Sequence, residues 1–352
     1  RVLLDDANIS TREGGAITAT MTAADVIRSL AVAISASKGT SVSGGIAVNV
    51  LTGNNALSAK GAILASDAGV TLAANSGGTI ESLSGGAAVS LGGTGVGAAV
   101  SANFIDRTSD VIFDNAVLTT NNSALSITSN STTGIKALAV GLAVSTGSTA
   151  VSGSIAIGDI GNTVRAAGAG AQLLDSGAGS KTISATKTDT IEILSGAVSA
   201  SGSNAIGGAI TSATINGGAE ARLTGLAGLT GTGDLTVNAS KSGVIDAIAV
   251  SGSGSGATSI AGSFVFTMIG KPGANAARSQ EVQGDTGGSP VADAEADTIA
   301  ERDKAVADLN TALANNVGSR TTLLSTQSPT LTKDDVTVAE LSENLILFHG
   351  KL

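Results

Sequence analysis

The stretch Ile27-Arg28-Ser29-Leu30 decides the architecture, because the chain repeats its pattern four more times. Each copy has an isoleucine, a charged residue, a free position and a second apolar residue. The later copies are Ile80–Leu83, Ile135–Leu138, Ile191–Leu194 and Ile245–Ile248. Self-similarity at a fixed period, here about 54 residues, is the signature of a repeat protein, so we interpret this period before any local motif.

A second set of apolar residues gives the same period independently. Its members recur at the same interval as the isoleucines, and they are Leu51, Ile105, Ile160, Ile215 and Ile269. Five residues before each lies another apolar residue, and seven before each lies Gly or Ala. Several positions therefore keep their type through five copies, which predicts one stacked unit of about 54 residues per repeat.

The composition favours a thin core of small side chains. The chain of 352 residues has 48 glycines and only 1% aromatic residues, with mean hydropathy +0.33. It is too apolar for a disordered chain and too poor in large rings for the core of an ordinary compact domain. A narrow interior, repeated many times, fits this composition.

Charge and cysteine content exclude several classes of function. The net charge is −9 and no basic patch occurs, so nucleic acid is not an expected partner. Cysteine is absent, which removes disulfides, thiolate sites and cysteine-based zinc sites. No uninterrupted apolar run is long enough for a membrane-spanning helix, so no such segment is expected. The chain starts within a repeat, and we expect it to be an excerpt of a longer protein.

Within each repeat the apolar residues alternate with polar ones, as in half-buried strands. Val70–Ala74 and Leu125–Ser129 are examples, and all three prolines lie after residue 270. Turn signals such as Gly53-Asn54-Asn55 and Asn121-Asn122 separate the alternating segments. We therefore predict several short strands in each unit.

The fold class that fits is all-β, a right-handed parallel β-helix of about 54-residue repeats over residues 1–270. We expect two to three coils per repeat, with the isoleucine and leucine of each Ile-charge-x-Leu copy in the core. The charged residue should point outward, at a distance from the next copy that is too large for direct pairing. A chain of small antiparallel β-sandwiches is the alternative fold.

The rhythm stops after Ile269. Residues 271–330 are predicted to be an inserted loop and amphipathic helix, with the helix at about 290–315, starting after Ser289 and Pro290. The β-helix should resume over 331–352, where Val336-Thr337-Val338 resembles Leu235-Thr236-Val237, and the chain ends mid-repeat. The helix presents an apolar stripe that its own β-helix or another chain would cover.

Residues for catalysis are few. His349 is the only histidine and has no motif around it. Asp106, Asp110 and Asp114 lie four residues apart and would share a face of a continuous strand, where they could bind Ca²⁺ or act as acid and base; solvated turn and edge charges are the favoured interpretation. Gly-rich stretches such as 92–97 lack the Lys-Ser/Thr of a phosphate loop. No catalytic, cofactor-binding or metal-binding residue, and no cofactor, is therefore nominated.

The repeats resemble those of very large bacterial exoproteins, the haemagglutinin-like adhesins and the leukotoxin-type secreted proteins. The resemblance rests on Gly45–Leu51, an Asn-rich turn, the Val-Thr-Leu-Ala segment 70–73 and the Ile-x-x-Leu-x-Gly-Gly-Ala segment 80–87. It covers about residues 6–270 and 331–352. It implies export to the bacterial cell surface or medium, a β-helical fibre, and a role in adhesion, biofilm or cell–cell contact.

The sequence thus favours a non-enzymatic structural segment of an extracellular adhesin or surface filament. Neighbouring copies or adjacent repeats of the same protein are the expected partners, and a cell-surface or glycan ligand is a further hypothesis. A carbohydrate-active β-helix enzyme is one alternative, because such enzymes use close carboxylates in a groove. A toxin passenger fragment is the other, although no basic amphipathic helix supports it.

Overall fold

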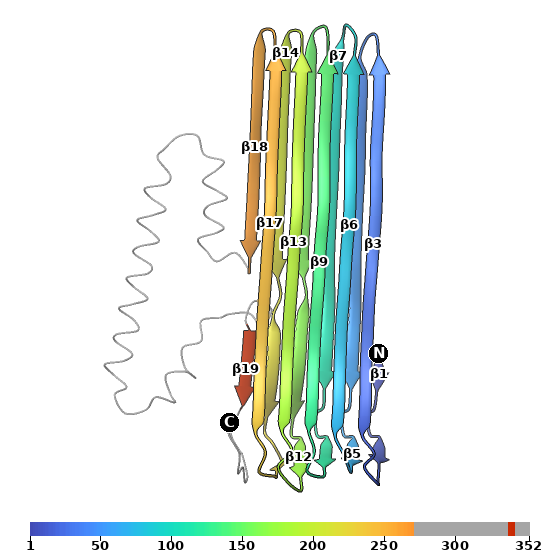
Figure 1. Ribbon diagram of the computed structural model, residues 1–352, viewed down its shortest axis with the longest axis vertical. Coiled ribbons are helices and arrows are strands. Elements are labelled where there is room, and N and C mark those ends of the chain that lie inside the picture. Colours follow the sequence, from blue (N-terminus) through green and yellow to red (C-terminus); the bar gives the residue numbers. More distant parts are fainter. Residues whose placement is uncertain (271–336, 342–352) are drawn as a thin grey trace, which may run out of the picture. The chain divides into compact units, whose positions relative to one another are not determined.

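The computed structural model describes residues 1–270 and the strand at 337–341. The chain divides into two units, one of Arg1–Ile269 with Val336–Leu352 and one of Gly270–Asp335. The described part contains strands and turns, arranged as three parallel sheets (Figure 1). The predicted insertion 271–330, its helix at 290–315, and His349 lie outside the described residues.

Five long strands form the first sheet, which we call the long sheet, and five short strands form a small sheet. The long sheet contains β3 (Ile17–Ser37), β6 (Val70–Ser90), β9 (Leu125–Ser145), β13 (Lys181–Ser201) and β17 (Leu235–Ser255). The small sheet contains β2 (Asn8–Ser10), β5 (Ile63–Ser66), β8 (Val117–Thr120), β12 (Gln172–Asp175) and β16 (Gly228–Leu229).

The remaining strands form the return sheet, in which the chain runs back from each long strand. They are β1 (Val2–Leu3), β4 (Ser41–Ser58), β7 (Thr94–Ile112), β10 (Thr149–Gly161), β11 (Thr163–Ala169), β14 (Asn204–Asn216), β15 (Ala219–Thr224), β18 (Thr258–Ile269) and β19 (Thr337–Leu341). Each coil therefore passes once through each sheet, and the next coil stacks on it (Figure 1).

Every strand pairing between these elements is parallel, which confirms the parallel β-helix and excludes the antiparallel sandwiches. The prediction of two to three coils per repeat was wrong. Ile80 pairs with Ile27 on one side and Ile135 on the other, so each repeat makes one coil. At about 4.8 Å per strand, five coils stack over roughly 24 Å. The right hand of the coil stays a prediction.

One coil accommodates a whole repeat because its strands are unusually long. Each long-sheet strand has 21 residues, where strands of 3–10 are usual. Each repeat does contain several strands, but the prediction that all of them are short was wrong, and Gly53-Asn54-Asn55 lies inside β4 rather than in a turn. Ser, Ala and Gly are accepted on either face of a strand. The alternation of inward and outward side chains therefore continues through segments in which the sequence does not alternate between apolar and polar residues.

The repeated Ile-charge-x-Leu stretch is split between the two faces of the long sheet. Ile80, Ile135 and Ile191 are fully buried, as predicted. The fourth residue is not in the core, because positions three apart point to opposite faces of a strand. Leu30 is 71% exposed, on the same face as Arg28, so the prediction of a buried leucine was wrong.

The two long layers almost touch near the turns that join β3 to β4, β6 to β7 and β9 to β10. We call this region the narrow end. A Cβ on Gly86 would lie 2.0 Å from the carbonyl oxygen of Ala98, and a Cβ on Gly97 would lie 1.9 Å from that of Leu142. Only Gly, Ala and Ser fit between the sheets here, and the valines and isoleucines are displaced to the outer faces.

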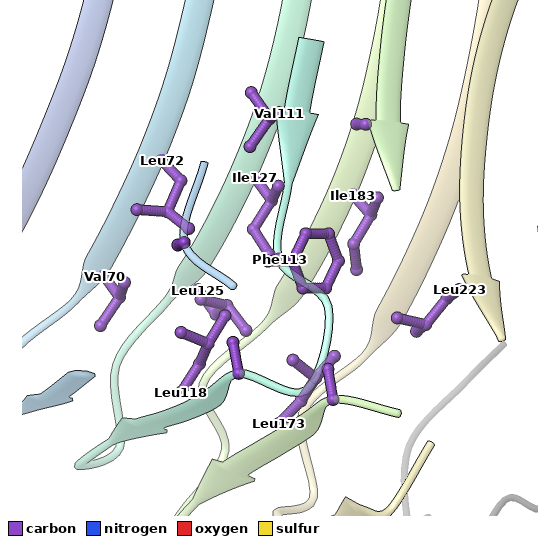
Figure 2. Packing of buried hydrophobic residues seen from close by; sticks show 14 of the residues in the cluster. Val70, Leu72, Val111, Phe113, Leu118, Leu125, Ile127, Leu173, Ile183 and Leu223 are labelled. Atoms are coloured by element: carbon purple, nitrogen blue, oxygen red, sulfur yellow. The ribbon is translucent and has the colours of Figure 1, made fainter. Parts of the chain in front are cut away.

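The opposite end of each coil is wider, because the small sheet closes a third side. Its core is built from Leu, Ile, Val and the single fully buried aromatic residue of the described part, Phe113 (Figure 2). Leu72, Ile127 and Ile183 of the long sheet point into this core. Gly168 of β11 makes room for the ring, since a Cβ there would lie 2.2 Å from Phe113 Cε2.

The chain returns to the β-helix in β19. This strand pairs with β15, with Thr337 opposite Ala219 and Val338 opposite Glu220. The sequence match of Val338 with Val237 was therefore wrong, because β19 extends the return sheet and not the long sheet.

Candidate interaction surface

One row of charges crosses the outer face of the long sheet. The strand register places the charged residues of the five repeats side by side, in the order Arg28, Glu81, Lys136, Glu192 and Asp246. Arg28 Nε donates to Glu81 Oε2 at 2.6 Å, and Lys136 Nζ lies 3.0 Å from Glu192 Oε2. The expectation that these charges are too far apart to pair was wrong, because one coil per repeat separates them by only one strand spacing.

These ion pairs contribute little to stability. Both are solvent-exposed, with the Arg28 side chain 75% and the Lys136 side chain 60% accessible, and exposed pairs are worth about 0–1 kcal/mol. Their signs alternate along the first four coils, which keeps like charges apart. The row borders a shallow, open depression of about 630 Å³, together with the leucine row that begins at Leu30 and Leu83.

The outer face of the return sheet has a second hollow, and it is almost wholly apolar. A groove of about 490 Å³ crosses β7, β10, β14 and β18. Its floor is the row Ala98, Gly153, Gly208 and Gly262, and its wall is the row from Val100 to Phe264. Both rows come from the outward positions of strands whose inward positions are filled mainly by Gly, Ala and Ser.

The three aspartates singled out from the sequence do not converge on a common site. Asp110 is bound by Arg165 at 3.2 Å, and Asp114 Oδ1 accepts a hydrogen bond from the amide of Ala169 at 3.0 Å. Asp106 instead lies near Asp159 of β10, whose pKa is raised by burial and then by the Asp106 charge. Across the parts of the chain that the structure describes, no group of three or more His, Cys, Asp or Glu could hold a metal ion.

The most unusual buried groups form an ion pair inside β13. Lys187 and Asp189 are both fully buried, and Lys187 Nζ donates to Asp189 Oδ2 and to the carbonyl oxygen of Asn216. Asp189 also accepts from Thr133 Oγ1 at 2.6 Å and Asn162 Nδ2 at 3.1 Å. Burial, with the nearby charge of Lys241, lowers the pKa of Lys187 to about 7.

This pair links the two layers rather than forming a reaction site. Its partners come from β9, from the break between β10 and β11, and from the end of β14, so its hydrogen bonds hold neighbouring coils and opposite sheets in register. No substrate could reach it while both side chains remain at zero exposure. The sequence contained a signal for this burial. Lys187 and Asp189 lie an even number of residues from the buried Ile183 and Ile191, and residues at even spacing in a strand point to the same face.

Comparisons with known proteins add no further identification. No family model matches the chain, and no curated protein or solved structure matches it. Within residues 1–270 and 337–341, no helix is long and apolar enough to cross a membrane. The candidate site therefore rests on geometry alone, and it is the pair of outer faces rather than any enclosed pocket.

Proposed function

We propose that the chain is a non-enzymatic structural segment of a large extracellular bacterial adhesin or surface filament. The observation that carries the proposal is the unbroken stacking of one coil per repeat, in register over five repeats. Such a stack is extended by adding coils and makes a linear scaffold whose outer faces are available for contact. The resemblance of the repeats to those of large bacterial exoproteins supports secretion and the cell surface as its location.

An attachment assay tests this function. The full chain would be displayed on bacteria that lack their own adhesins, and attachment to abiotic surfaces and to other cells would be counted. We expect more attached cells than with a display control of similar length but unrelated fold. Attachment equal to that control would contradict the proposal.

A carbohydrate-active enzyme is the second candidate, and one observation favours it. Asp106 and Asp159 are neighbouring carboxyl groups on an outer face, and the raised pKa of Asp159 suits a general acid. This candidate predicts cleavage of an acidic or neutral polysaccharide that is lost in Asp159→Asn and in Asp106→Asn. If the purified chain releases no reducing ends or unsaturated sugars from a polysaccharide panel, the enzyme hypothesis fails.

A further inference from the structure

The outer face of the return sheet carries a continuous surface without charge, which we call the apolar panel. It consists of the outward residues within 42–48, 96–102, 151–157, 206–212 and 260–266, placed side by side by the strand register. Among these outward positions Ser212 is the one polar side chain, and Ile46 is 69% exposed. Contiguous apolar surface of this extent on a monomer usually marks an interaction site.

The panel has relief. Its floor row contains Gly153, Gly208 and Gly262, and the row from Val100 to Phe264 rises beside it as the wall of the 490 Å³ groove. On the other side of the floor the strand register places a second apolar row, which includes Val151, Ile206 and Ile260. A Cβ on Gly153 or Gly262 would meet nothing within 4 Å, and neither glycine has a positive φ.

The chain's own packing therefore does not require glycine in this row. Gly97 and Gly86 differ, because the opposite sheet leaves them no room. Glycine weakens a strand interior, and it is typical of places where a ligand or another chain approaches the backbone closely. The floor row has the shape expected for an incoming ridge of side chains.

The panel is complementary to itself. The wall row, from Val100 to Phe264, forms the ridge of the panel. A two-fold axis that crosses the strands midway between the floor row and this ridge row exchanges the two rows. It places Ile155 of each copy over Gly153 of the other, with each strand facing its own counterpart in the second copy. The match holds for every coil, because floor and ridge rows keep the same spacing in all five repeats.

The same operation brings the polar row of Thr149 against the row of Asp159, which holds Val50, Phe104, Thr214 and Met268 in the other coils. Asp159 lies six residues beyond the floor residue Gly153, and it comes to face Thr149, four residues before Gly153 in the second copy. Asp159 Oδ1 is buried and has no hydrogen-bond partner in the described structure. Because Oδ1 is covered by its own chain, the Thr149 hydroxyl of the second copy can donate to it only after the Asp159 side chain turns outward on association.

The area is sufficient for a stable pair. From the Thr149 row to the Asp159 row a strand spans 11 residues, and five strands lie side by side, so the face measures roughly 36 by 24 Å, or about 850 Å². A standard protein–protein interface buries about 800 Å² per partner.

We propose that a second copy of this chain packs on the apolar panel, return sheet against return sheet, with the ridge of each copy in the groove of the other. The inference rests on the proposed scaffold function and names its partner and contact face. A membrane is a poorer occupant, because one rim of the panel is a row of Thr and Asn, the other includes Asp159, and the chain has a net charge of −9.

Sedimentation velocity of the full chain over a concentration series tests the pairing. The informative variant is Gly153→Val with Gly208→Val, which fills the groove, and the matched control is Gly196→Val with Gly252→Val on the outer face of the long sheet. We expect dimers for the wild type and the control. The groove variant should dimerise at least 10-fold more weakly, with a thermal unfolding midpoint equal to or above that of the wild type.

Several results would overturn the proposal. The two valines add apolar surface, so non-specific hydrophobic association would make the groove variant dimerise as tightly as the wild type or more tightly. That result would contradict a specific fit of ridge into groove. A monomeric wild type would also overturn it. Flotation of the chain with phosphatidylcholine vesicles would then identify a membrane as the occupant of the panel. Protection of the panel from carbene labelling in the monomer would identify another segment of the same chain.

Cross-linking tests the register, since the chain has no cysteine of its own. The axis places Val151 opposite Ile157 of the second copy. A mixture of Val151→Cys and Ile157→Cys chains should be joined by a short bis-maleimide faster than a mixture of Val151→Cys and Ile260→Cys chains, and equal rates would refute the geometry. If the groove variant no longer dimerises but still supports cell attachment, the dimer proposal fails and the proposed scaffold function stands, because the scaffold requires only the stacked coils.

Discussion

Two glycine substitutions test how closely the layers approach at the narrow end. Gly97 of β7 points inward, and Gly153 of β10 points outward. A Cβ on Gly97 would lie 1.9 Å from the Leu142 carbonyl oxygen, far inside ordinary van der Waals contact, whereas a Cβ on Gly153 would meet nothing within 4 Å. Gly97→Ala and Gly153→Ala therefore make the same chemical change with opposite steric consequences.

The expected magnitudes follow from the neighbours. The atom that blocks Gly97→Ala belongs to the backbone of a strand paired on both sides, so the sheets must separate, and we expect a loss of about 3 kcal/mol, the upper part of the range for overpacking. Gly153→Ala should gain about 0.5–1 kcal/mol, because alanine loses less conformational freedom on folding. The two variants should differ by about 4 kcal/mol, the sum of these two effects.

Urea unfolding followed by circular dichroism measures this difference, and amide hydrogen exchange along β7 and β9 localises it. Protection should fall at the narrow end of the affected coils in Gly97→Ala and remain at the wide end around Phe113. If Gly97→Ala is as stable as Gly153→Ala, the two sheets do not approach as the structure has them and the explanation for the small interior residues fails.

Three further predictions concern charges. Lys187→Ser or Asp189→Thr alone should cost about 3–5 kcal/mol in urea unfolding, because each leaves a buried charge unpaired, whereas the double variant, which copies Ser131 and Thr133 of the neighbouring coil, should cost much less. Equal losses in the single and double variants would contradict the ion pair. The pKa of Lys187 is about 7 in the folded state and about 10.4 in the unfolded state, so the unfolded state binds more protons between these two pH values. The free energy of unfolding of the wild type should therefore rise with pH across that window, relative to that of the double variant. Parallel pH profiles of the two proteins would contradict this prediction. Lys136→Glu should lower stability by about 0.5–1 kcal/mol at low salt and regain it at high salt, with Lys136→Gln as the uncharged control, and a salt-independent loss would exclude the electrostatic explanation.

The sequence alone was sufficient for the period, the strand type and the parallel stacking. Ile80 and Ile105 recur at the same interval through five copies, and alternating residues around them predicted half-buried strands. These features follow from local chemistry, since an isoleucine at a repeated position is covered wherever a coil stacks on both sides, as at Ile105, Ile160 and Ile215. The charged row was also predicted to face outward, and it does.

The number of coils per repeat could not be predicted, because it depends on how far a strand continues through Ser, Ala and Gly. These residues are accepted on either face of a sheet, so the sequence does not show where the strand ends. The buried Lys187–Asp189 pair was missed for a related reason: charged residues are assigned to the surface unless their partners, here Asn162 and Thr133 from other coils, are known.

The sequence therefore determined that the chain stacks as repeated parallel coils with isoleucine at the centre. Only the tertiary structure decided which side of the narrow end is apolar. Ile46 lies outside because the opposite sheet is close beside it, so that a Cβ on the inward neighbour Gly45 would lie 2.3 Å from the Ala31 carbonyl oxygen. That distance is a property of the closed coil rather than of any segment. Leu30 lies outside for a local reason, because it is three residues from the inward position of Ile27.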